Sequence, residues 1–139
     1  MNKIQIKKCY PYNQDMFGKV VYLHELDLWL EDIILFQLVN LVTLKGLNLS
    51  HNNITDISSL EGLVNLEHLY LSENNITDIL ALSHLNNLET LVLHNNEITD
   101  ISFLGNLKNL RYLSLRRNYI VESQIDELRK VLPNCEISY

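Results

Sequence analysis

Apolar residues recur along this chain with a 22-residue period. The repeating unit reads L-x-x-L-x-L-x-x-N-x-I-x-x-I-x-x-L-x-x-L-x-x and is most regular between residues 44 and 121. Its central leucine recurs as Leu47, Leu69, Leu91 and Leu113. Its asparagine recurs as Asn52, Asn74, Asn96 and Asn118. Self-similarity at a fixed period of about 20–50 residues predicts a solenoid, because one unit buries its apolar face only against a stacked neighbour.

Each unit predicts a short strand, a turn and a return. The L-x-x-L-x-L segment alternates apolar and polar positions, as a half-buried strand does. The asparagine that follows predicts a turn, because its side-chain amide can bond backbone groups of the loop. The remaining apolar residues, three apart, favour a 3₁₀-like or extended return, so that stacked units form a parallel sheet with right-handed crossovers. Seven strands are expected, centred near Gln5, Asp27, Asn48, Tyr70, Val92, Ser114 and Glu136.

The two ends of the chain depart from the repeat and are expected to cap it. We predict one domain over residues 1–139, with an N-terminal cap and partial repeat in 1–22, repeats in 23–121 and a C-terminal cap in 122–139. In the C-terminal cap, Ser123 is predicted to N-cap a helix over residues 124–131, and Pro133 to end it. The residues of this segment expected to face the core are Ile125, Leu128, Val131 and Leu132.

The motif Asn-x-Ile-Thr-Asp-Ile, found at residues 52–57, 74–79 and 96–101, carries a family resemblance. Residues 23–121 resemble the 22-residue subclass of leucine-rich repeats found in a nuclear regulator of protein phosphatase 1 and in bacterial internalins. The segment 128–137 resembles the ending of many small bacterial leucine-rich-repeat proteins. The resemblance implies an α/β-repeat fold: a curved, right-handed leucine-rich-repeat solenoid with the parallel sheet on its concave face and short returns on its convex face.

The resemblance further implies that partners bind the concave face of the sheet. The residues between the strand leucines vary from unit to unit, as a specialised surface on a fixed scaffold does. Interfaces concentrate binding energy in Trp, Tyr and Arg. The predicted contact surface is therefore Trp29, Tyr70, Val92, His94, Tyr112 and Arg116, together with Glu25, Asp27 and His68.

Structural roles compete with binding at these positions. Trp29 can pack under the N-terminal cap or stack with Lys7 on a neighbouring strand. Tyr70 and Tyr112 can be ordinary solvent-facing aromatic residues of a sheet. The arginines at 111, 116 and 117 can simply pair with Glu136 and Glu122, as surface charges often do.

Composition narrows the function classes. The net charge of −6 disfavours nucleic acid as the main partner. Two cysteines, Cys9 and Cys135, make no disulfide framework and fit small buried positions of the repeat. The five histidines lack metal-ligand spacing, and no phosphate-binding loop or catalytic constellation is present, so we expect no metal, no cofactor and no enzyme. The aspartates Asp56, Asp78 and Asp100 recur with the repeat and are interpreted as turn residues.

The leading hypothesis is a non-catalytic protein-interaction module, either an adaptor or a regulatory or inhibitory subunit. Without a signal peptide or an apolar stretch long enough for a membrane span, a cytoplasmic monomer with no membrane partner is expected. One alternative is a secreted or surface-bound, internalin-like adhesin fragment, and another is a phosphatase regulatory subunit. An enzyme that captures its substrate through the repeats would need a second domain.

Overall fold

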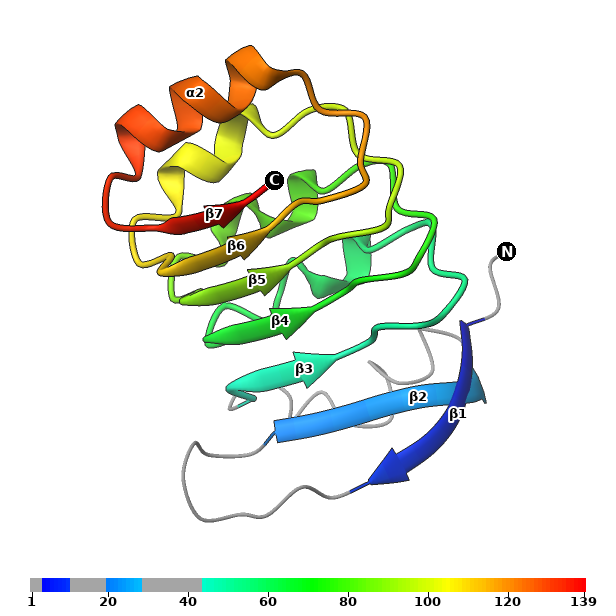
Figure 1. The fold of residues 1–139 in the computed structure, drawn as a ribbon. Helices are drawn as coiled ribbons and strands as arrows, with labels where there is room; N and C mark the ends of the chain where they lie inside the picture. The colour runs from blue at the N-terminus through cyan, green and yellow to red at the C-terminus, as the bar shows by residue number, and fades with distance from the viewer. Residues whose placement is uncertain (1–3, 11–19, 29–43) are drawn as a thin grey trace.

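Among the residues that the structure describes, seven strands form one sheet in which each strand lies beside its neighbours in the sequence (Figure 1). The computed structural model describes residues 4–10, 20–28 and 44–139. The strands are β1 (Ile4–Tyr10), β2 (Val20–Leu28), β3 (Gly46–Asn48), β4 (His68–Tyr70), β5 (Thr90–Val92), β6 (Tyr112–Ser114) and β7 (Glu136–Ser138). Behind the sheet, the same described residues form the 3₁₀ helices η1 (Ser58–Leu60), η2 (Leu80–His84) and η3 (Ser102–Asn106) and the α-helix α2 (Glu122–Val131).

The central strands pair in the register that the 22-residue period predicts. Leu47 lies opposite Leu69, Leu69 opposite Leu91, and Leu91 opposite Leu113, all in parallel pairs. The returns are 3₁₀ helices of three to five residues, so the predicted strand, turn and 3₁₀ return are confirmed for this part of the chain. Each repeat is one coil of a solenoid and adds one strand and one 3₁₀ turn.

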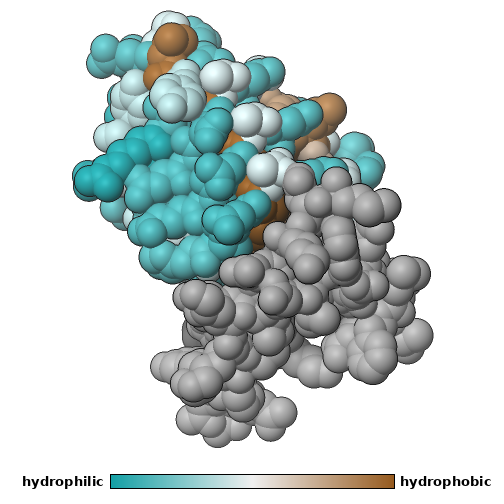
Figure 2. Space-filling view, turned by 90° about the vertical axis from the view of Figure 1, so that its right-hand side faces the viewer, coloured by the Kyte–Doolittle hydropathy of each residue, from teal (hydrophilic) through white to brown (hydrophobic). Residues whose placement is uncertain are grey.

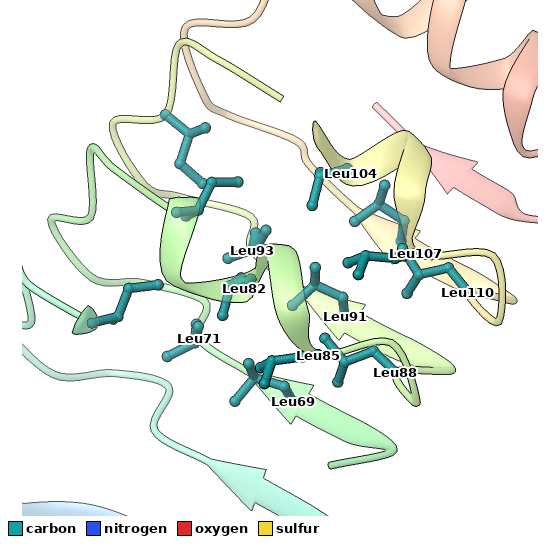
Figure 3. Close-up of a cluster of buried hydrophobic side chains, with 14 of the residues drawn as sticks. Leu69, Leu71, Leu82, Leu85, Leu88, Leu91, Leu93, Leu104, Leu107 and Leu110 are labelled. Atoms are coloured by element: carbon teal, nitrogen blue, oxygen red, sulfur yellow. The ribbon is translucent and has the colours of Figure 1, made fainter. Parts of the chain in front are cut away.

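The leucine and isoleucine columns fill the space between the sheet and the 3₁₀ helices (Figure 3). Leu69, Leu91 and Leu113 are 0% exposed, so every strand leucine of the central coils is packed on all sides. A fully buried leucine contributes about 1.5–3 kcal/mol through the apolar surface that it removes from water. Because each column extends through successive coils, the core is continuous along the stack.

The asparagine column connects successive coils by hydrogen bonds. The Nδ2 group of Asn74 donates to the carbonyl of Leu71 in its own coil and to that of Leu49 in the coil before it, both at 3.0 Å. Its Oδ1 atom accepts from the backbone N–H of Ile54 at 3.0 Å. The predicted turn role is confirmed, and the bonds also extend to the preceding coil, so this buried ladder fixes the stacking of neighbouring repeats.

The N-terminal strands correct two predictions. β1 runs antiparallel to β2, with Gln5 opposite Asp27, whereas seven parallel strands were expected. β2 pairs parallel with β3 only through Val20–Tyr22, with Val20 opposite Gly46 and Tyr22 opposite Asn48. The nine residues between β1 and β2 are fewer than the dozen or so that a parallel crossover needs, so the chain returns antiparallel.

The C-terminal cap also departs from the prediction. Helix α2 begins at Glu122 with Val121 as its N-cap, so Ser123 lies inside the first turn. Ile125, Leu128 and Leu132 are buried as predicted, because positions three and seven residues apart share one helix face. Val131 lies off that stripe and is 47% exposed, which contradicts its predicted core position.

Strand β7 sits two residues later than the repeat predicts. Glu136 lies opposite Tyr112 and Ser138 opposite Ser114, whereas Glu136 was expected beside Ser114. An α-helix rises about 1.5 Å per residue against about 2.0 Å for a 3₁₀ helix, so more residues are needed to cross the same distance. The ten-residue α2 therefore shifts the register of the last strand.

Candidate functional site

The candidate site is the sheet face, which we define as the side chains of strands β3–β6 and of the residue two positions after each strand that point away from the leucine core. Alternation along the strands sets this arrangement: Leu69 is buried, while His68 and Tyr70 on either side of it are half-buried. Pairing of the strands brings Tyr70 beside Val92 and Thr90 beside Tyr112. The sheet face thus collects Tyr70, Val92, His94, Tyr112, Arg116 and His68, six of the residues predicted from sequence.

The middle of the sheet face is closely packed. Val92 is 9% exposed between Tyr70 and Ser114 in the strand register, so it offers little surface to a partner. Tyr70 and Tyr112 keep more of their surface exposed. The aromatic side chains are therefore the larger apolar features of this face.

One border of the sheet face is polar and internally bonded. The hydroxyl of Ser72 donates to the Oγ atom of Ser50 at 2.9 Å. The Oγ atom of Ser114 lies 3.4 Å from Nδ1 of His94. These contacts link neighbouring coils and hold the predicted His94 in place beside β6.

The arginines near the C-terminal end do not pair as the structural alternative proposed. Arg111 forms an ion pair with Glu89, with 3.6 Å between Nε and Oε2, and not with Glu136 or Glu122. Lys45 and Glu67 make the equivalent pair two coils earlier. Arg116 and Arg117 are exposed, and in the described part of the chain no carboxylate lies within ion-pair distance of either.

Two predicted contact residues, Glu25 and Asp27, are not brought onto this part of the sheet. Glu25 and Asp27 pair with Lys7 and Gln5 of β1. The residues of β2 that lie beside Gly46 and Asn48 of β3 come five positions earlier in the chain. The prediction that they continue the columns of the central coils is wrong, because β2 enters the sheet at Val20. Trp29 lies outside the described residues.

The aspartate column stabilises turns, as predicted. Oδ1 of Asp56, Asp78 and Asp100 accepts from the backbone N–H two residues later, at 2.8–2.9 Å. For Asp100, the hydrogen bonds from the backbone and the side chain of Ser102 lower the carboxyl pKa below its usual value. The ladder therefore keeps its carboxylates exposed, in contrast to the buried asparagines.

A shallow hollow of about 550 Å³ lies between η1 and η2, on the side of the coil away from the sheet face. Glu61 and His84 line it, with 3.9 Å between Oε1 and Nδ1. Across residues 44–139 and the two N-terminal strands, no group of three or more His, Cys, Asp or Glu side chains is placed to hold a metal ion. Nor is any helix within the same described residues long and apolar enough to cross a membrane.

Several exposed apolar residues at the C-terminal end were not predicted as site residues. Tyr119 is 69% exposed, Val121 59% and Tyr139 47%. Tyr119 occupies a column that holds Asn53, Asn75 and Glu97 in the earlier coils, so the change from polar to aromatic was visible in the sequence. Figure 2 looks onto the side where strands β3–β6 end and shows a mainly hydrophilic surface with small apolar patches.

Comparison with known families identifies the repeat. The family described as Leucine Rich repeats (2 copies) matches residues 42–84 and 86–130, more than half of the chain. The protein therefore belongs to the leucine-rich-repeat family. Among the curated proteins, a search found no match to this chain.

Solved structures of similar fold include bacterial and plant leucine-rich-repeat proteins. Internalin C2 of Listeria monocytogenes is 36% identical, with a TM-score of 0.66 over 73% of this chain and 44% of that one. An internalin of the same organism, inlF, is 32% identical, with a TM-score of 0.66 over 73% and 29%. The ectodomain of the Arabidopsis thaliana receptor kinase GASSHO1/SCHENGEN3, solved in complex with Casparian strip integrity factor 2, is 32% identical, with a TM-score of 0.52 over 63% and 12%. The chain thus spans less than half the length of these structures.

Proposed function

We propose that this chain is a non-catalytic protein-interaction module that binds a protein partner through its sheet face. The observation that carries the proposal is the contrast within one 22-residue period: the core columns keep one residue type, while the sheet face changes from Tyr70 to Val92 to Ser114 across adjacent strands. Leucine-rich-repeat proteins generally mediate protein–protein interactions, which supports a binding role. We further propose that the chain acts inside the cell as an adaptor or as a regulatory or inhibitory subunit.

The shape of the face supports a macromolecular partner over a small molecule. Adjacent strands are about 4.8 Å apart and rise about 3.3 Å per residue, and Val92 in the middle of the face is packed to 9% exposure, so the strands of the described coils present a broad surface. Specific protein interfaces bury about 800 Å² on each partner, whereas small-molecule sites are concave and enclose their ligands. Tyr70 and Tyr112 supply the aromatic anchors that such interfaces favour.

The internalin similarity favours a second candidate, a secreted or surface-bound binding protein that uses the same face. The two candidates differ in where the protein is found. Immunoblotting of cytoplasmic, surface and culture-supernatant fractions from the source cells distinguishes them. Recovery in the cytoplasmic fraction supports the leading proposal, and recovery at the surface or in the supernatant supports the second.

The binding proposal is tested by affinity capture, with the wild-type protein compared with a Tyr70→Ala, Tyr112→Ala variant. The baits are exposed to cytoplasmic, surface and secreted material, and the captured proteins are identified by mass spectrometry. We expect a prey that the wild type retains and the variant loses. The same prey retained by both proteins would place the binding surface elsewhere.

A matched control variant, Leu80→Ala with His84→Ala, changes two exposed residues of η2 on the other side of the coil. It also truncates two large side chains to Ala and leaves the sheet face unchanged. The control is expected to retain the prey. Circular dichroism of all three proteins verifies that each is folded.

A further inference from the structure

A patch at the C-terminal end of the solenoid combines two exposed cations with exposed apolar side chains. We define the C-terminal patch as Arg116, Arg117, Tyr119, Val121 and Tyr139. All five are exposed, and Tyr119 is the most exposed large apolar residue among those described. The patch shares Arg116 with the sheet face and begins where β6 ends.

Hydrogen bonds hold these residues together. The backbone N–H of Leu115 donates to the carbonyl of Ser138 at 2.8 Å, which places Tyr139 alongside the segment that leads to Arg116. The hydroxyl of Tyr139 donates to the carbonyl of Ile120 at 2.9 Å, between Tyr119 and Val121 in the chain. The apolar surface therefore rests on a fixed backbone next to the arginines.

The charges of the patch differ from those of the earlier coils. The left-handed position before each ladder asparagine holds His51, Glu73, Asn95 and Arg117 in turn. His51 and Glu73 pair with each other, with 2.8 Å between Nδ1 and Oε2, so the carboxylate of Glu73 has a partner. Arg116 and Arg117 have no such carboxylate among the described residues, and Glu136 lies beside Tyr112, four residues from Arg116 along the strand direction. Two unmatched positive charges thus gather in a chain whose net charge is −6.

We propose that the C-terminal patch binds an acidic segment of a protein partner, with the partner's carboxylates on Arg116 and Arg117 and an aromatic side chain against Tyr119. Guanidinium groups bind carboxylates through paired, charge-assisted hydrogen bonds. Complementary charge orients the partner along the solenoid, so the proposal deepens, and rests on, the protein-binding function of the sheet face. An extended phosphate backbone would also run past the acidic remainder of a chain whose net charge is −6, whereas a short acidic segment of a protein meets only the patch.

The test measures fluorescence anisotropy of a labelled peptide, Glu-Asp-Glu-Phe-Glu-Asp-Glu, titrated with the full chain. The variant Arg116→Gln with Arg117→Gln is expected to weaken peptide binding about tenfold, because two exposed charge pairs are removed. The matched control, Arg129→Gln with Lys130→Gln, removes the same charge from α2. Those two cations already pair with Asp126 and Glu127, so the control is expected to change the affinity less than about twofold.

A double-mutant cycle tests the aromatic contact. Replacing Phe of the peptide by Ala should weaken binding to the wild type but have a much smaller effect on the Tyr119→Ala protein, because the two rings interact. Equal losses on both proteins would overturn the assignment of Tyr119.

The proposal as a whole would be overturned if the wild type did not bind the peptide, or if the Arg116→Gln, Arg117→Gln protein bound it as tightly as the wild type. It would also be overturned if the α2 control lost as much affinity as the arginine variant, or if the wild type bound a single-stranded DNA heptamer more tightly than the peptide. Sedimentation velocity is run alongside, and a dimer that dissociates in the arginine variant would instead assign the patch to self-association. The patch variants retain Tyr70 and Tyr112. A negative result in the peptide test therefore contradicts only the C-terminal patch, while the capture experiment tests protein binding by the sheet face independently.

Discussion

Positions that recur with the 22-residue period fall into two classes, buried columns that keep one residue type and sheet-face columns that change it. Leu69, Leu91 and Leu113 are identical and fully buried. Directly beside them, Tyr70, Val92 and Ser114 differ at every step. A side chain in the leucine core must fit the coils before and after it and the returns behind the sheet, so the stack demands uniformity, whereas a sheet-face side chain meets only its neighbours on the sheet and what lies above the face.

The two polar ladders repeat the contrast. The amide of Asn96 is buried and donates to the carbonyls of Leu71 and Leu93, in two different coils. The carboxylate of Asp78 is exposed and accepts one hydrogen bond from Leu80, two residues away. The asparagine therefore holds coils together, and the aspartate stabilises only its own turn.

The largest effect is expected from exchanging the two ladder residues by isosteric substitution. Asn96→Asp places a carboxylate against two carbonyl oxygens in a buried site and should destabilise the fold by about 4 kcal/mol. The reciprocal change, Asp78→Asn, keeps the accepting oxygen and should stay within about 0.5 kcal/mol of the wild type. Urea unfolding followed by circular dichroism measures the free energy of unfolding of both variants. Equal losses would show that burial does not make the asparagine ladder more sensitive than the aspartate ladder.

The leucine columns give the next largest effect. Leu91→Ala removes a side chain that is 0% exposed and leaves a cavity bordered by the neighbouring coils. The expected loss is about 3 kcal/mol of unfolding free energy. The exposed Leu80 is the matched control, and Leu80→Ala should cost less than about 0.5 kcal/mol. Similar costs at both sites would contradict the continuous core.

A third column has uniform backbone and varying side chains. His51, Glu73, Asn95 and Arg117 all have φ between 54° and 60°, in the left-handed region. Arg117→Val should destabilise the protein by about 1–2 kcal/mol relative to Arg117→Gly, because a β-branched residue is strained there and glycine is not. Both variants lose the same charge, so the difference isolates the backbone, and melting temperatures that agree would argue against this strain.

The smallest effect is expected from acid. The pKa of Asp100 is lowered below the ordinary 3.8 by the hydrogen bonds from Ser102, so the folded state favours the carboxylate. Its contribution to stability is complete above the unfolded pKa and is lost as the pH falls through the lower, folded pKa. Thermal unfolding from about pH 6 to about pH 3 should show a larger loss for the wild type than for Asp100→Asn. Parallel pH profiles would rule out this linkage.

The period predicted the central coils correctly because packing between coils permits only one register. It failed at β1 and β2, where Ile4, Ile6 and Leu26 imitate the strand pattern but the short connection forces an antiparallel pair. It failed by two residues at β7, because an α-helix replaces the 3₁₀ return. Sequence pattern records which faces are apolar and does not record how long each connection must be.

The candidate site was predictable to a similar extent. Alternation placed Tyr70, Tyr112 and His94 on the sheet face, and in the structure Tyr70 lies beside Val92, Tyr112 beside Thr90 and His94 near Ser114. The exposed left-handed position of Arg117 was not predictable, since only Asn95 in that column has the residue type typical of such a backbone. The approach of Tyr139 to Ile120 depends on the shifted register of β7 and was equally hidden.

The central claim is that the buried columns determine stability while the sheet face determines binding. It is tested most directly by measuring two quantities on one protein, Tyr70→Ala with Tyr112→Ala: the free energy of unfolding in urea and the affinity for the captured partner by calorimetry. We expect stability within about 1–2 kcal/mol of the wild type and an affinity at least about 100-fold weaker, because aromatic anchors dominate interfaces. An unchanged affinity in the folded variant would contradict the claim.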